Sequence, residues 1–278
     1  MTEDLRNSPI GVFDSGMGGL TVMKALMARL PRESFVYLGD TARLPYGSKS
    51  PETVRRYAVQ CAHALAAYRI KLLVVACNTA SATALPALIE ALNPTPVLGV
   101  IEPGADAAVA MAAAGRIAVL ATEGTVKGGA YMRAIHARNP RAQVIQQACP
   151  LFVALAEEGL TEGPIPQLVA ERYLNPMLAE AQSRPQCLVL GCTHFPVLKE
   201  VIAQVAGRHM ILVDSAETTA HAVEHLLSEK SLARGGNAAT PPRFLATDAP
   251  ERFARVGEIF LGRKIPLDAV ELVDLQQV

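Results

Sequence analysis

Two short apolar runs, each followed by a small residue and a cysteine, constrain the fold of this chain more than any other feature. The first, LLVVAC, spans residues 72–77, and the second, CLVLGC, spans residues 187–192. Runs of Val and Leu without polar alternation are typical of strands that are buried on both faces of a parallel sheet. Cys77 and Cys192 are therefore expected at the carboxyl ends of strands, where α/β proteins usually bind their ligands.

Predicted strands and helices alternate along most of the chain. The first 80 residues have the order strand, helix, strand, helix, strand, with short connections. Such alternation is typical of a doubly wound parallel sheet. The order then repeats, and Asp14 lies 63 residues before Cys77 much as Thr122 lies 70 residues before Cys192. These similar intervals indicate two similar halves.

The predicted fold class is therefore α/β, with two similar doubly wound parallel-sheet domains related by pseudo-two-fold symmetry and an active site in the cleft between them. We assign residues 1–97 plus 208–278 to a discontinuous first domain and residues 98–207 to the second. The C-terminal tail carries predicted strands at 244–247 and near 270–273. We expect this tail to return to the first domain and complete its sheet.

Charge and composition argue against several classes of protein. Lys plus Arg and Asp plus Glu both number 26, so the formal net charge is zero and gives no electrostatic case for binding nucleic acid or an anionic membrane. The first residues lack the basic and apolar segments of a signal peptide, and charged residues interrupt every Ala-rich stretch. Five cysteines at irregular spacing predict reduced thiols rather than a disulfide framework. We expect a cytoplasmic protein.

Three other interpretations of these residues are weaker. A buried cysteine is by default a small hydrophobic side chain. The repetition of the whole segment, a buried strand end with its cysteine and the polar residues after it, favours a function; we call each copy a corner. A zinc site built from Cys187, Cys192 and His194 lacks paired Cys-x-x-Cys spacing, so no metal is expected. The glycines of residues 16–19 imitate a dinucleotide-binding fingerprint, but Thr21 occupies the third glycine position. No cofactor is therefore expected.

Two thiols that face one small ligand have a specific chemical use. One Cys-His pair would suffice for acyl transfer. Racemisation needs two groups, because a proton leaves one face of a stereocentre and returns to the other. A cysteine pKa lies near 8.5 and is lowered at a helix N-terminus, where both thiols are expected. We predict that Asp14 assists Cys77 and that His194 assists Cys192.

The residues around the two cysteines can hold carboxylates without a formal positive charge. Hydroxyl and amide side chains there can bind an anion together with backbone N–H groups at helix starts. The backbone N–H groups near Gly16 and Gly47 are further candidates. The side chains in question are those of Ser15, Asn78, Thr79 and Thr193.

The sequence resembles a known family. Seven motifs occur in the family's order, and together they closely resemble those of bacterial glutamate racemases, in the aspartate/glutamate racemase superfamily. They span residues 11–22, 37–40, 45–47, 76–80, 99–103, 149–153 and 190–196.

The resemblance implies a cofactor-independent isomerase that interconverts L- and D-glutamate for peptidoglycan synthesis, and a homodimer. By motif position it makes Cys77 and Cys192 the two catalytic bases, with Asp14 and His194 beside them. It makes Asp40 and Glu157 supporting carboxylates. The substrate-binding residues that it implies are Asp14, Ser15, Tyr46, Gly47, Asn78, Thr79, Thr193 and His194.

Two alternatives remain open from the sequence. An aspartate racemase would share both cysteines and would differ in the pocket for the distal carboxylate. A non-catalytic module that binds an amino acid would not depend on either thiol. An assay with both amino acids separates the first alternative, and replacement of each cysteine separates the second.

Overall fold

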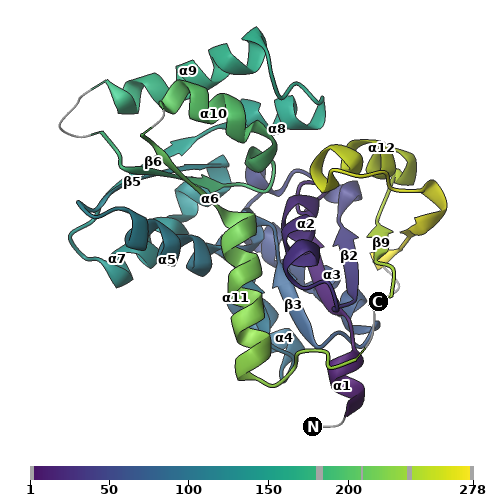
Figure 1. Cartoon of the computed structure of the whole chain (residues 1–278). Coiled ribbons are helices and arrows are strands. Elements are labelled where there is room, and N and C mark those ends of the chain that lie inside the picture. Colours follow the sequence, from purple (N-terminus) through teal and green to yellow (C-terminus); the bar gives the residue numbers. More distant parts are fainter. Residues whose placement is uncertain (1–2, 180–183, 208, 237–239, 276–278) are drawn as a thin grey trace.

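The computed structural model describes residues 3–179, 184–207, 209–236 and 240–275, and its strands form two parallel sheets (Figure 1). Every strand pair within each sheet is parallel. The first sheet has the order β10 (Val270–Leu272), β9 (Arg243–Ala246), β2 (Phe35–Gly39), β1 (Ile10–Asp14), β3 (Leu72–Val75), β4 (Val97–Gly99). The second has the order β6 (Gln143–Ala148), β5 (Arg116–Ala121), β7 (Cys187–Gly191), β8 (Ile211–Asp214). The predicted α/β fold with two doubly wound sheets is confirmed.

Helices cover both faces of the first sheet. One face packs against α2 (Leu20–Arg29), α11 (Ser215–Glu229) and α12 (Pro250–Leu261). The other face packs against α3 (Pro51–Ala66) and α4 (Asn78–Leu92). Strands β1, β2 and β3 are buried along their whole length, as their uninterrupted apolar runs predict. A short helix, α1 (Glu3–Asn7), precedes β1.

The second sheet is covered in the same way. One face packs against α8 (Pro150–Glu157), α9 (Pro164–Leu178) and α10 (Lys199–Ala206). The other packs against α5 (Ile101–Met111) and α7 (Ala130–Arg138). Helix α6 (Glu123–Gly128) follows β5. The short 3-10 helices are η1 (Thr41–Arg43), η2 (Tyr46–Ser48), η3 (Phe195–Leu198) and η4 (Leu267–Ala269). The two layered halves therefore share one architecture.

The C-terminal tail returns to the first sheet, as expected. Strand β9 pairs with β2, and β10 pairs with β9 at the outer edge. In Figure 1 the tail, drawn in yellow, carries α12 to the side of the first sheet near α2. No helix in the described part of the chain is long and apolar enough to cross a membrane.

The predicted domain boundaries disagree with the sheets at two strands: the boundary at 97 falls inside β4, and β8 lies in the second sheet. Strand β4, residues 97–99, pairs with β3 of the first sheet, because the short connection after α4 returns it beside the strand that precedes α4. Strand β8, residues 211–214, pairs with β7 of the second sheet for the same reason. Residue 208, where one predicted boundary falls, lies outside the described residues. The domain division stays a prediction, with β4 and β8 exchanged between the two parts.

Candidate active site

Cys77 lies two residues after the end of β3 and immediately before α4. It is the N-cap residue, and its thiol accepts a hydrogen bond from the Ala80 N–H at 3.4 Å. The backbone N–H groups at a helix start lack partners within the helix, so an N-cap side chain of this kind stabilises the helix. The predicted position at the carboxyl end of a buried strand is confirmed for this cysteine.

The thiol of Cys77 lies among polar groups of the first half. Its sulfur is 3.6 Å from the Ser15 hydroxyl, and the residue is only 5% exposed. Burial and the neighbouring Asp14 carboxylate raise the pKa of Cys77 to about 12. Hydrogen bonds from Ala80 and Ser15 oppose this shift. The surroundings of Cys77 therefore favour the neutral thiol.

Asp14 ends β1 and is fully buried. One carboxylate oxygen, Oδ2, accepts the Gly16 N–H at 2.9 Å, and Oδ1 has no partner among the described residues. Burial raises the pKa of Asp14, whereas the charge of His194 and backbone N–H groups lower it. A buried carboxylate oxygen without a partner is costly, so Asp14 is poised to accept a proton or a hydrogen bond from a bound ligand.

Cys192 follows β7 and belongs to a different arrangement. Its sulfur lies 3.8 Å from His194 Nδ1, and His194 Nε2 lies 3.2 Å from Glu157 Oε1. Burial lowers the pKa of His194, but hydrogen bonds with Cys192 and Glu157 raise it to about 10. An imidazolium stabilises a neighbouring thiolate. Cys192 therefore has an imidazole as its polar neighbour, where Cys77 has a hydroxyl and a carboxylate.

One expectation about this second corner is wrong. Thr193 and His194 do not begin an α-helix but precede the 3-10 turn η3, and α10 begins only at Lys199. Pro196 stands in the first turn of η3, where proline is compatible with a helix start. The thiol of Cys192 therefore lacks the N-cap contact that Cys77 makes, and His194 is its polar partner instead.

Contacts between the two halves bring the corners together. A methyl group at Gly18 would lie 2.5 Å from both His194 Nδ1 and Thr193 Oγ1, so only glycine fits there. The Thr21 hydroxyl donates to the Thr193 carbonyl at 3.0 Å. Cys192 also contributes to the raised pKa of Cys77, after burial and Asp14. The structure thus brings Asp14, Cys77, Cys192 and His194 into one site.

The predicted ligand-binding residues of α4 face the second half as well. The hydroxyls of Thr79 and Thr122 lie 3.0 Å apart. Asn78 Oδ1 accepts the Tyr131 hydroxyl at 2.8 Å, while its buried Nδ2 has no partner in the described part of the chain. Thr122 and Tyr131 were not among the predicted site residues. The interval of Thr122 from Cys192, which matches that of Asp14 from Cys77, was the available signal.

Tyr46 and Gly47 lie beside these residues, in η2. The Tyr46 hydroxyl donates to Asp40 Oδ2, and Arg43 binds the same carboxylate at 2.7 Å. The buried Tyr46 side chain therefore anchors the loop of residues 40–48 through Asp40. A methyl group at Gly47 would lie 2.8 Å from the Thr122 side chain, so the loop passes close to the second half.

Cys187 lies at the opposite end of β7 from Cys192. Its sulfur is 3.7 Å from the Ala108 carbonyl oxygen, inside the core between β7 and α5. The weak zinc alternative required Cys187, Cys192 and His194 to share one ion, but Cys187 begins the five-residue strand β7 and Cys192 follows its last residue. This geometry does not fit that alternative.

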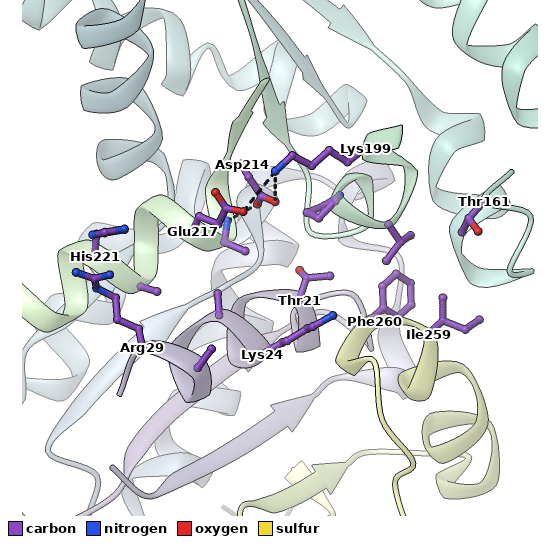
Figure 2. A pocket seen from close by; sticks show the side chains of 16 residues that line it. Thr21, Lys24, Arg29, Thr161, Lys199, Asp214, Glu217, His221, Ile259 and Phe260 are labelled. Atoms are coloured by element: carbon purple, nitrogen blue, oxygen red, sulfur yellow. Dashed lines mark hydrogen bonds and ion pairs between the residues drawn. The ribbon is translucent and has the colours of Figure 1, made fainter. Parts of the chain in front are cut away.

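A pocket next to the site is lined by neither of the two thiols. It has a volume of about 810 Å³ and is lined by α2, α11, α12 and the segment around η3 (Figure 2). Phe260 lines this pocket and also packs edge-on against the His194 ring, with the ring centroids 5.0 Å apart. His194 is thereby held between Gly18 and Phe260.

Comparison with known proteins identifies the family. Residues 10–223 match the family model described as Asp/Glu/Hydantoin racemase. The chain belongs to this family. Its predicted site residues Asp14, Cys77, Cys192 and His194 all lie inside the matched range. The motif-based resemblance is therefore confirmed at the level of the family.

Named members of the racemase family match nearly the whole chain. Glutamate racemase of Geobacter metallireducens is 50% identical over 92% of this chain and 93% of its own length. The crystal structure of glutamate racemase from Francisella tularensis subsp. tularensis SCHU S4 with D-glutamate has a TM-score of 0.90 at 38% identity, covering 98% of this chain and 100% of that chain. The Picrophilus torridus aspartate racemase has a TM-score of 0.55 at 17% identity, covering 82% of this chain and all of that one, a likeness of fold alone.

Proposed function

We propose that this protein interconverts L- and D-glutamate by a two-thiol mechanism without a cofactor. The observation that carries the proposal is the pair of buried cysteines at equivalent strand ends, each beside its own acid/base partner and brought together by contacts between the halves. The relatives named glutamate racemase, and the one solved with D-glutamate, support glutamate as the substrate.

In the proposed reaction one cysteine acts as thiolate and the other as thiol. The thiolate takes the α-proton, so that a C–H bond breaks and an S–H bond forms. The opposite thiol then gives its proton to the other face of the same carbon, and its S–H bond breaks as the new C–H bond forms. The unlike surroundings of Cys77 and Cys192 support such a resting state, with a thiol at Cys77 and a thiolate at Cys192.

Two unpartnered buried atoms support the binding of an amino acid between the thiols. Asp14 Oδ1 can accept a hydrogen bond from an ammonium group, and Asn78 Nδ2 can donate one to a carboxylate. We assign further substrate contacts to the hydroxyls of Ser15, Thr79 and Thr193, to His194, and to the backbone around Tyr46 and Gly47. A bound ammonium group also favours thiolate formation at Cys77 by its positive charge.

The α-proton of glutamate is far less acidic than a thiol, so the site must stabilise the carbanionic transition state. Preorganised N–H and O–H donors in a site closed to water act strongly on developing charge. The buried amide of Asn78 and the buried hydroxyls of Thr79 and Thr193 supply such donors. We propose that they hold the α-carboxylate, where negative charge accumulates as the proton leaves.

The remaining expectations stand as parts of the same proposal. D-glutamate produced here would serve peptidoglycan synthesis, and the protein would act as a cytoplasmic homodimer. The five cysteines are free and buried, which supports a reducing compartment. Exposed apolar side chains on α9, such as Ile165 and Leu168, are candidates for a subunit contact.

The deciding experiment follows the α-proton signal by NMR in deuterated buffer with purified protein and no added cofactor. Loss of the signal from L- and D-glutamate, with L-aspartate unchanged, is the expected result. Exchange of aspartate in place of glutamate would favour the aspartate racemase alternative. No exchange of either amino acid would favour the non-catalytic binding module.

A further inference from the structure

Helix α12 reaches the proton-transfer machinery of Cys192 from the far end of the sequence. Arg252 lies in its first turn, and the Arg252 guanidinium binds Glu157 Oε2 at 2.8 Å. Glu157 in turn holds His194 through its other oxygen. We propose that Arg252 is a positioning residue for racemisation, which fixes Glu157 and thereby the imidazole that serves Cys192. The inference rests on the proposed function.

The contacts form one continuous chain from sulfur to guanidinium. Sγ of Cys192 lies 3.8 Å from Nδ1 of His194, and Nε2 of the same ring lies 3.2 Å from Glu157. Glu157 uses Oε1 for the ring and Oε2 for Arg252, so both oxygens of the carboxylate are held. A carboxylate that is fixed at both oxygens orients an imidazole more firmly than one held at a single point.

The chain of contacts also links the two halves of the molecule. Glu157 ends α8, which packs on the second sheet, whereas Arg252 begins α12, which packs on the first. Phe260, two turns further along α12, packs edge-on against the same imidazole. Helix α12 therefore contacts His194 directly through Phe260 and indirectly through Arg252 and Glu157.

Arg252 also helps to stabilise the negative charge of Glu157. Burial raises the pKa of Glu157, but His194 and Arg252 lower it below its ordinary value. The other charged or titratable groups that act on His194 are Cys192 and Asp14, and Arg252 acts on Glu157. Without Arg252, the pKa of Glu157 rises and the imidazole keeps a partner that is less firmly held.

Three variants test the proposal, and all keep the buried core intact because Arg252 is 41% exposed at its side chain. Arg252→Met removes the charge but keeps the length of the side chain. Arg252→Lys restores the charge without the planar donor group. Arg255→Met, at an exposed position one turn along the same helix, is the matched control.

The primary readout is the substrate deuterium isotope effect on kcat/KM in each direction, with α-deuterated L- and D-glutamate. The two enantiomers have equal free energy, so any variant must lower kcat/KM equally in both directions. The isotope effects can still diverge, because slowing the proton transfer at Cys192 makes C–H cleavage more rate-limiting for the enantiomer that Cys192 deprotonates, and less for the other. His194→Asn and Asp14→Asn give the two reference patterns.

We expect Arg252→Met to lower kcat/KM about tenfold, with isotope effects that diverge in the same sense as in His194→Asn and opposite to Asp14→Asn. Arg252→Lys should recover part of the loss, and Arg255→Met should match the wild type. Equal isotope effects in both directions, or divergence in the sense of Asp14→Asn, would overturn the proposal.

A second readout does not depend on turnover. The Nε2–H proton of His194, held by Glu157, should give a slowly exchanging NMR signal that His194→Asn removes. Arg252→Met should broaden this signal, and Arg255→Met should leave it sharp. A signal unchanged in Arg252→Met would count against the positioning role. A wild type that exchanges no glutamate while this signal responds as expected would leave the contact chain supported and the proposed function wrong.

Discussion

The two thiol corners occupy equivalent places at the ends of β3 and β7, yet they are built from different groups. Cys77 caps an α-helix and has a hydroxyl and a buried carboxylate as neighbours. Cys192 has no helix to cap and faces an imidazole instead. Burial and Asp14 raise the pKa of Cys77 to about 12, whereas His194, whose own pKa rises to about 10, places positive charge beside Cys192.

This difference shows how similar halves can perform unlike tasks at one moment. Racemisation requires one thiol and one thiolate, and two identical corners would have no means to assign these states before the substrate arrives. Here burial and a negative neighbour favour the thiol at Cys77, whereas the neighbour of Cys192 is a positively charged imidazole. The asymmetry of the partners therefore prepares the site for one direction of proton transfer, and the reaction itself reverses it.

Removal of either sulfur should have the largest effect. Cys77→Ser and Cys192→Ser each replace a thiol by a much weaker acid, so we expect racemisation of glutamate, followed by circular dichroism, to fall by about 10³-fold in both variants. Cys187→Ser, which changes a buried thiol outside the site, is the control. Near wild-type racemisation in either site variant would show that one thiol suffices, and the two-thiol mechanism would be wrong.

Removal of the partners should have the next largest effect. Asp14→Asn and His194→Asn keep both sulfurs, and we expect each to lower exchange by about 10²-fold. The pH profile of kcat/KM, which reports groups of the free enzyme, should separate them. His194 has a pKa of about 10 and acts as the charged partner, so wild-type kcat/KM should fall as the pH rises through 10. This alkaline limb should be lost in His194→Asn and kept in Asp14→Asn.

Chemical modification tests the charge of Cys77 directly. Because its pKa is about 12, its alkylation by a small uncharged reagent should accelerate about tenfold per pH unit between pH 8 and 10. Asp14→Asn removes a negative neighbour that raises this pKa, so alkylation of Cys77 at pH 8 should become faster. Mass spectrometry of each cysteine peptide measures both rates. A pH-independent rate at Cys77 would contradict the assignment of a neutral thiol.

The smallest effect is expected at Tyr46, whose hydroxyl binds Asp40 in the first half of the molecule. Tyr46→Phe removes the hydrogen bond to buried Asp40 and leaves Arg43 and the Thr247 hydroxyl as the partners of that carboxylate. We expect a loss of about 1 kcal/mol in the free energy of unfolding, measured with urea, and a change of less than about threefold in KM. A large increase in KM with unchanged stability would mean that the Tyr46 hydroxyl contacts the substrate itself.

Local sequence was a sound guide to the central strands and a poor one to the edges. Strands β1, β3 and β7 are buried on both faces, and their apolar runs predict them. β4 and β8 are edge strands that are partly exposed, and nothing in their composition states which sheet they join. Their placement follows from the pairing of each with the strand one helix earlier. The predicted boundary at 97 therefore cut β4 after its first residue, and the one at 208 separated β8 from its sheet.

The same distinction applies to the site. Asp14, Cys77, Cys192 and His194 could be predicted because each stands at the end of a recognisable strand or within three residues after it, where the geometry of a parallel sheet brings side chains together. Arg252 and Tyr131 could not, because their partners lie 95 and 53 residues away in the sequence. Both stand on amphipathic helices whose local pattern predicts only a buried and an exposed face.

The sequence by itself determined the alternation of strands and helices, the places where the strands end, and the thiols that stand there. These depend on local patterns of apolar residues and on residue types, which a chain carries with it before folding. Only the tertiary structure decided which charges face each thiol, because the His194–Glu157–Arg252 contacts and the burial of Asp14 arise when distant segments pack together. The pKa of a group depends on that packing, so the chemistry of the two corners is a property of the folded molecule.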